Sequence, residues 1–178
     1  MHIKYVESEK IAKFIIKWKL LVSKYDLYFL YPPLTIVYTS PPMSEKMLKF
    51  VEIGQQNPPK RDKNSRKEDF NEIYSEFIKG KANEQSSRCS QCGVPFCQVH
   101  CPLSNNIPDW LKLTAEGRHE EAYQLSQSTN NMPEVCGRIC PQDRLCEGNC
   151  VIEQSGHGTV TIGSIEKYIT ETAWENGW

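Results

Sequence analysis

Cysteine is absent from residues 1–88 of the chain, and all eight cysteines fall between positions 89 and 150. The sequence also lacks an excess of charge of either sign, because 21 basic and 22 acidic residues leave a formal net charge of −1. A chain so close to neutrality gives no electrostatic case for binding nucleic acid, so we expect no nucleic-acid partner. The crowded cysteines are therefore the main indication of function.

The chain also has little that would send it out of the cell or into a membrane. Its apolar N-terminal stretch is interrupted by Lys17, Lys19, Lys24 and Asp26, and no small-residue cleavage site follows. The longest uncharged run, residues 27–44, contains prolines that make it a poor membrane helix. Disulfides need an oxidising compartment, so metal-binding thiolates are favoured over a disulfide framework. We expect a cytoplasmic protein with no membrane partner.

Apolar residues recur at helical spacing, and no run alternates in the manner of a strand, which predicts an all-α fold. Residues 105–117 and 118–127 predict two short helices separated at Gly117. Residues 161–177 predict a final helix that ends at Gly177. Its residues expected to face the core are Ile162, Ile165, Ile169 and Ala173.

The sequence divides into three parts. Residues 1–42, with an amphipathic stretch at positions 11–18, are interpreted as an irregular N-terminal extension that packs poorly on the rest, and Met43 is a candidate true start. Residues 43–80 are a lead-in segment with one predicted helix at 68–80, ended by Gly80. The apolar face expected for that helix is formed by Phe70, Ile73, Tyr74, Phe77 and Ile78. Residues 81–178 form the cysteine-rich domain.

The spacing of the cysteines distinguishes between metals. Zinc sites usually combine two short Cys-x2-Cys pairs, and here only Cys89 and Cys92 have that spacing. The first group instead reads Cys-x2-Cys-x4-Cys-x3-Cys-Pro, similar to the run of bacterial ferredoxins, in which the fourth cysteine ligates the other cluster. The middle gap is four residues where ferredoxins have two, so the loop must follow a different path. A structural zinc module for protein assembly remains the alternative.

By this logic Cys89, Cys92 and Cys97 hold one 4Fe-4S cluster, and Cys101 belongs to a second one. The first site needs one distant cysteine, and the second needs three more ligands from the segment 136–150 or beyond. The second group of cysteines is Cys136, Cys140, Cys146 and Cys150. The spacing does not decide which of these serves which cluster.

Three long motifs of this chain are similar to motifs of one protein family. They are CSQCGVPFCQVHCPLSNNIPDWL, EVCGRICPQDRLCEGNC and GTVTIGSIEKYITETAWENGW. From about Met43 to the end, the chain is similar to the N-terminal iron–sulfur domain of the small (beta) chain of NADPH-dependent glutamate synthase. The same domain type, an alpha-helical ferredoxin domain, occurs in dihydropyrimidine dehydrogenase.

The resemblance implies two 4Fe-4S clusters with crossed ligation. One cluster would be held by Cys89, Cys92, Cys97 and Cys150, and the other by Cys101, Cys140, Cys146 and Glu166. In the family the last ligand is a Glu or Gln sixteen residues after the final cysteine, which is Glu166 here. The alternative is that Glu166 pairs with Lys167 or Arg138 at the rim of the apolar face. Cys136 is then a buried free thiol or a rival ligand.

The resemblance also implies the role of the chain. No Ser-His-Asp set, free catalytic thiolate or paired acid is found, so no catalytic residue is expected, and the chain alone should not turn over substrate. FAD and NADPH would bind only in domains beyond Trp178. The clusters would relay electrons from FAD toward the large (alpha) subunit, which forms glutamate, or serve a related flavin-dependent NAD(P)H oxidoreductase. Arg138 and Arg144, beside the cysteines, are candidates to raise a cluster potential.

Overall fold

A computed structural model describes residues 47–77 and 79–178, which belong to the second of two units of the chain, residues 41–178. The extension predicted for residues 1–42 lies outside these residues. Within the described ranges, the regular elements are helices, and an isolated antiparallel bridge joins Lys60 and Tyr74. The all-α prediction is confirmed for this part of the chain.

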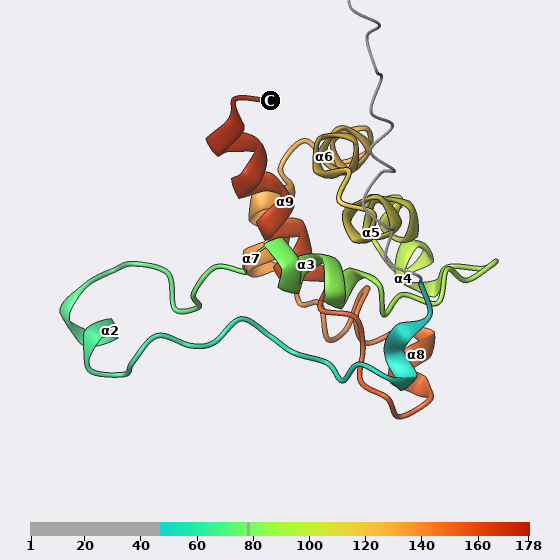
Figure 1. The fold of residues 1–178 in the computed structure, drawn as a ribbon, viewed down its shortest axis with the longest axis horizontal. Helices are drawn as coiled ribbons and strands as arrows, with labels where there is room; N and C mark the ends of the chain where they lie inside the picture. The colour runs from blue at the N-terminus through green and yellow to red at the C-terminus, as the bar shows by residue number, and fades with distance from the viewer. Residues whose placement is uncertain (1–46, 78) are drawn as a thin grey trace, which may run out of the picture. The chain divides into compact units, whose positions relative to one another are not determined.

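The described helices follow one another in a simple order (Figure 1). They are η1 (Lys49–Val51), α2 (Ser65–Glu68), α3 (Lys79–Ser86), α4 (Phe96–Val99), α5 (Ile107–Ala115), α6 (His119–Gln127), α7 (Pro133–Ile139), α8 (Val151–Gln154) and α9 (Ile162–Asn176). Helix α9 packs against α3, α5, α6 and α7, and α5 packs against both α3 and α6. None of these helices combines the length and apolar character needed to cross a bilayer.

Helices α5 and α6 are the predicted pair. Pro108 stands at the start of α5, where its missing N–H breaks no helical hydrogen bond. Trp110 and Leu111 are fully buried on the core side of α5. Gly117 has a φ of +77°, a left-handed conformation that suits glycine and allows the chain to turn into α6. The prediction of two helices separated at Gly117 is confirmed.

Helix α9 is the longest described helix and carries the predicted apolar face. Ile162, Ile165, Ile169 and Ala173 are all buried, as expected from their spacing. Burial of each isoleucine contributes about 1.5–3 kcal/mol to folding. Gly177 adopts a φ of 70° and ends the helix, as predicted.

Helices α7 and α9 approach each other closely at Gly137. A Cβ atom at this position would lie 2.8 Å from the carbonyl oxygen of Gly163 and 2.9 Å from the amide nitrogen of Lys167. Such distances are too short for any side chain, so glycine permits the two backbones to meet. This contact brings the end of α7, with Cys136 and Cys140, against α9.

The prediction of a helix over residues 68–80 is wrong. Residues 69–77 are not helical: the N–H of Arg61 donates to Ile73 O at 2.9 Å, and the N–H of Ser75 donates to Pro59 O at 2.9 Å. Phe70 is fully exposed and not part of an apolar face, although Phe77 is buried. Helix α3 begins at Lys79, so Gly80 lies inside a helix and does not end one.

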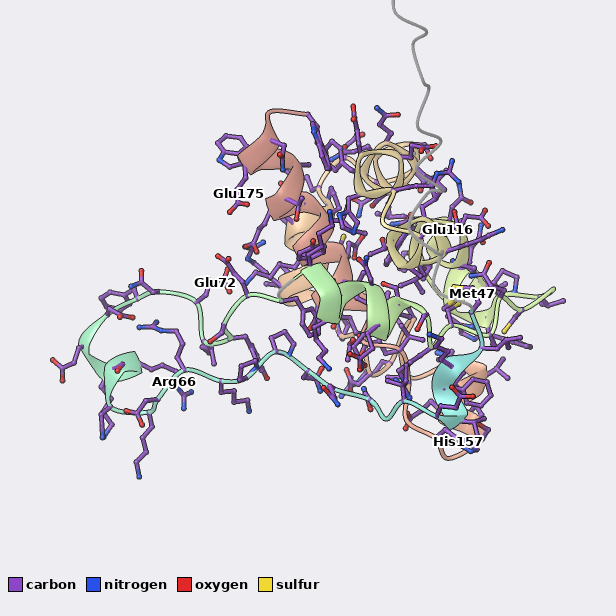
Figure 2. All side chains as sticks on the ribbon, in the orientation of Figure 1. Met47, Arg66, Glu72, Glu116, His157 and Glu175 are labelled. Carbon is purple, nitrogen blue, oxygen red and sulfur yellow. The ribbon has the colours of Figure 1, made fainter. Side chains whose placement is uncertain are left out.

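Tertiary hydrogen bonds explain why helical periodicity failed here. The guanidinium of Arg61 binds both carboxylate oxygens of Asp69, at 3.0 and 2.6 Å, and the backbone pairing closes the loop around α2. Figure 2 labels Arg66 at α2 and Glu72 where the segment returns toward α7 and α9. Glu72 forms ion pairs with Arg138 on α7 and Lys167 on α9, which attach the returning segment to both helices.

Candidate functional site

Four cysteines line a first cavity, between the segment 89–97 and the start of α8. They are Cys89, Cys92, Cys97 and Cys150. The rest of the lining is mostly apolar and includes Leu111, Ile152, Val160 and Ile162. The set implied by the family resemblance for one cluster is thus brought together in space, although Cys150 lies far from the other three in the sequence.

Local backbone structure turns the first sulfur loop toward this cavity. Gln91 has a φ of 52°, an uncommon left-handed conformation that reverses the chain between Cys89 and Cys92. Its side-chain amide lies 3.4 Å from the sulfur of Cys89 and donates to the carbonyl oxygen of Pro108 at 2.7 Å. The loop is therefore anchored to α5. Donors directed at a sulfur atom are typical of iron–sulfur sites, where they tune the cluster.

A second cavity is lined by Cys101, Cys136, Cys140, Cys146 and Glu166. It lies where the ends of α4 and α7 and the loop before α8 meet α9. The second set of ligands implied by the resemblance is Cys101, Cys140, Cys146 and Glu166. Cys136 adds a fifth side chain that could bind metal, through its sulfur, at the same cavity. Both possibilities for Cys136, free thiol or ligand, are compatible with this position.

Glu166 is buried and held by two amides rather than by a cation. The Nδ2 atoms of Asn105 and Asn130 each lie 3.2 Å from Glu166 Oε1. Burial raises the pKa of Glu166 to about 7, against the effect of the Asn130 hydrogen bond. Lys167 pairs instead with Glu72 and Glu171.

The alternative in which Glu166 pairs with Lys167 or Arg138 is therefore wrong for the described part of the chain. Arg138, the other candidate, also pairs with Glu72 and Glu171. Both amides bind Oε1, which leaves Oε2 of Glu166 without a hydrogen bond in the described part of the chain. A free carboxylate oxygen at the wall of a cysteine-lined cavity fits a metal ligand.

Glu147 connects the loop of Cys146 to the start of α9. Its Oε1 atom accepts the backbone N–H of Gly163 at 3.0 Å, so it caps the helix that carries Glu166. Burial raises the pKa of Glu147, while hydrogen bonds from the backbone N–H groups of Gly163 and Ile162 oppose the shift. Sequence reasoning missed this contact, because Glu147 is followed by glycine and lies outside any helix.

Burial also affects the thiols. It raises the pKa of Cys89 to about 11 and that of Cys97 to about 12, and it also raises the pKa of Cys146. For Cys140 burial and then the neighbouring Cys136 raise the pKa to about 11. Without iron these groups are neutral thiols at physiological pH. Since metal binds the thiolate, assembly of a metal centre must release their protons.

The donors fit iron–sulfur chemistry. All eight cysteines are free of disulfides, and seven of them were predicted as ligands. Within residues 47–77 and 79–178, no group of three or more His, Cys, Asp or Glu side chains is close enough to hold a single metal ion. Ile162, the first residue of α9, lines both cavities, so the two sites are separated by a shared wall.

Comparison with known proteins identifies the family. The sequence-family model described as dihydropyrimidine dehydrogenase domain II, 4Fe-4S cluster, matches residues 66–178. The chain belongs to this iron–sulfur family. All eight cysteines and Glu166 lie inside the matched range, which assigns an iron–sulfur cofactor to the domain.

The relatives of this iron–sulfur domain include glutamate synthase small chains and an oxidoreductase. The glutamate synthase (NADPH) small chain of Azospirillum brasilense is 70% identical over 135 residues, which are 76% of this chain and 28% of that one. The protein of the same name from Escherichia coli is 51% identical over 136 residues, 76% of this chain and 29% of that one. The E. coli protein AegA, named as an oxidoreductase, is 49% identical over 115 residues, 64% of this chain and 17% of its own length. The chain thus spans less than a third of these relatives.

Proposed function

We propose that the domain holds two 4Fe-4S clusters, one in each cysteine-lined cavity. The first would be bound by Cys89, Cys92, Cys97 and Cys150, and the second by Cys101, Cys140, Cys146 and Glu166. Each cluster supplies a one-electron carrier when it is bound. The observation that carries this proposal is the division of the cysteines between two cavities that are separated by Ile162. Adjacent sites of this kind suit an electron relay.

Glu166 is the proposed fourth ligand of the second cluster, in preference to Cys136. The two asparagine amides fix Oε1 and leave Oε2 free at the cavity wall. Residues that orient a metal ligand in this way are a regular feature of metal centres. Cys136, by contrast, lies within α7 at the same cavity and is not among the ligands that the family resemblance implies. It is proposed to remain a free thiol when the cluster is bound.

The proposed role is electron transfer in a glutamate synthase small chain. Electrons from NADPH would reach FAD in parts of such a small chain outside this domain, then the two clusters, and then the large subunit that forms glutamate. The support is the 70% identity to the Azospirillum small chain. The domain itself is proposed to contribute no catalytic residue and to act in the cytoplasm.

Metal analysis of protein purified without oxygen tests the proposal. We expect about eight iron and eight sulfide per chain and little zinc, as two 4Fe-4S clusters require. A broad visible absorbance should bleach on addition of dithionite. About two zinc per chain, with no sulfide and no colour, would instead establish the structural zinc module.

A second candidate is the electron-transfer domain of a related flavin-dependent oxidoreductase, which the 49% identity to AegA favours. Metal analysis does not separate the two candidates, but partner binding does. Under the first proposal, the iron-loaded protein should form a complex with the glutamate synthase large chain from the same genome in anaerobic size-exclusion chromatography. Failure to co-elute at micromolar concentrations, with intact clusters, would favour the oxidoreductase.

A further inference from the structure

Arg88, directly before Cys89, is a fully buried arginine that binds only backbone carbonyl groups. Its Nε atom donates to Ile53 O at 2.8 Å, and its Nη2 atom donates to the carbonyl oxygens of His157 and Gly158 at 2.9 and 2.8 Å. Nη1 donates to Thr159 O. The guanidinium thus joins the segment 157–159 to Ile53, two residues after η1, next to the first cavity.

The charge of Arg88 has no carboxylate partner. No Asp or Glu of residues 47–77 and 79–178 lies within ion-pair distance of it, and its hydrogen-bond acceptors are neutral. A buried cation without an anion is costly, since carbonyl dipoles replace only part of its hydration. Burial lowers the pKa of Arg88, and the charges of Cys150 and Glu153 act in the opposite direction.

The first cavity can supply the missing anion. Cys89, the next residue, lines this cavity, and so does Val160, which directly follows the Thr159 carbonyl group that Arg88 binds. A 4Fe-4S cluster bound by four thiolates carries a net negative charge, which grows by one when an electron is added. The cavity walls are mostly apolar, so this charge is weakly screened from the guanidinium. The attraction is therefore stronger for the reduced cluster.

Resting on the two-cluster function proposed above, we propose that Arg88 stabilises the reduced state of the cluster in the first cavity and makes it the higher-potential cluster of the two. The step is the gain of one electron from a reductant, reduced flavin in the relay or dithionite in the test. No bond is made or broken and no proton is transferred. Arg88 is a tuning and positioning residue, because it does not bind iron.

Among the described residues, no buried lysine or arginine lines the second cavity. Its buried polar groups are the Glu166 carboxylate and the neutral amides of Asn105 and Asn130. Arg138, which the sequence suggested as a tuning residue, is neutralised by ion pairs with Glu72 and Glu171. Arg144, the other suggestion, is exposed, and water screens its charge. The buried charge of Arg88 is therefore one difference between the cavities, beside their proposed ligands, which are four cysteines in the first and three cysteines with Glu166 in the second.

A potentiometric titration of the iron-loaded protein with dithionite, followed by electron paramagnetic resonance, tests the proposal. Glu166→Cys identifies the wave of the second cluster, because this substitution changes a proposed ligand of that cluster only. In the unaltered protein the other wave should have the higher potential. Arg88→Gln should lower the equilibrium constant for reduction of that cluster at least tenfold, which is about 59 mV for one electron.

Matched variants separate charge from structure. Arg88→Lys keeps the charge but loses part of the hydrogen bonding, and should shift the same wave less than threefold. Arg144→Gln removes an exposed charge and should leave both waves unchanged. Equal shifts in Arg88→Gln and Arg88→Lys, or equal shifts of both waves in Arg88→Gln, would overturn the proposal.

Two further outcomes keep the test decisive. If Arg88→Gln does not fold, the order of the two waves in the unaltered protein decides, and a lower potential for the first cluster overturns the inference. Protein without iron and sulfide would overturn the two-cluster function as well. Intact clusters with the wrong order of potentials would overturn only the role of Arg88.

Discussion

The side-chain amide of Asn130 lies 3.2 Å from Glu166 Oε1 and donates a hydrogen bond to it inside the helical core. Asn105 donates to the same oxygen atom from the loop before α5. Asn105 is 2% exposed and Asn130 is 3% exposed. Together they fix one oxygen of the carboxylate, and the other oxygen stays available to bind metal. This arrangement orients Glu166 toward the second cavity before any metal binds.

Asn130→Ala should therefore weaken the second metal centre. Loss of one buried hydrogen bond to a carboxylate costs about 1–3 kcal/mol, and Glu166 would then be held by Asn105 alone. We expect the iron content to fall from about eight toward about four per chain, since only the first 4Fe-4S cluster stays intact. Iron and sulfide analysis after anaerobic purification measures this. Asn176→Ala, an exposed asparagine on the same helix as Glu166, is the control and should keep full iron content.

Substitution of the two rival ligands decides which one completes the second cluster. Glu166→Ala should reduce the iron content by about half, because one cluster of two loses a ligand. Cys136→Ala should leave iron and sulfide unchanged, with folding as stable as before within about 1–2 kcal/mol. The opposite result, in which Cys136→Ala loses iron and Glu166→Ala does not, would assign the ligand role to Cys136.

The sequence predicted those elements whose structure depends on local pattern. Helices α5, α6 and α9 follow from apolar spacing and from Gly117 and Gly177, because each helix buries one continuous face. The residues around the two cavities were also identified from the sequence, but their grouping came from resemblance to a family. Cysteine spacing alone could not say that Cys150 lies with Cys89, since that contact depends on the packing of α8.

The sequence could not predict contacts that depend on distant backbone. Residues 69–77 have helical periodicity, yet their hydrogen bonds with residues 59–61 keep them out of a helix. Arg88 resembles any arginine before a cysteine until its four carbonyl partners from two remote segments are known. Asn105 and Asn130 likewise carry no signal, because asparagine is common in loops that precede helices.

Gly137→Ala should separate α7 from α9. Its new methyl group would meet Gly163 O and Lys167 N at distances below 3 Å, and both are backbone atoms that cannot move aside easily. Overpacking of this kind costs about 1–3 kcal/mol in the free energy of unfolding. Chemical denaturation measures the loss.

Gly80→Ala is the matched control for this experiment. Gly80 also lies within a helix, α3, but no atom lies within 4 Å of the position a Cβ would take. Alanine there should stabilise the protein by less than about 0.5–1 kcal/mol, the gain in a helix interior, because Gly80 is the second residue of α3. Equal destabilisation by both substitutions would contradict the close contact between α7 and α9.

Glu72 should make the attachment of residues 57–77 dependent on pH. Burial alone would raise the pKa of Glu72, but hydrogen bonds from Arg138 and Lys167 outweigh it, so the pKa is lowered. A lowered folded-state pKa means that the ion pairs stabilise the attached segment above the ordinary pKa of glutamate and are lost as pH falls through the lowered value. Limited proteolysis within residues 57–77, with an acid-active protease, should accelerate over that range. Because Glu72 is half exposed, the ion pairs contribute little to the stability of the attached segment, at most about 1 kcal/mol.

Two variants serve as controls. The Glu72→Gln protein should be cleaved faster than the unaltered protein at neutral pH, and its cleavage rate should lose this pH dependence. Glu76→Gln removes a carboxylate that has no ion pair in the described residues, so this protein should be cleaved like the unaltered one. A pH dependence that survives in Glu72→Gln would show that another group attaches the segment.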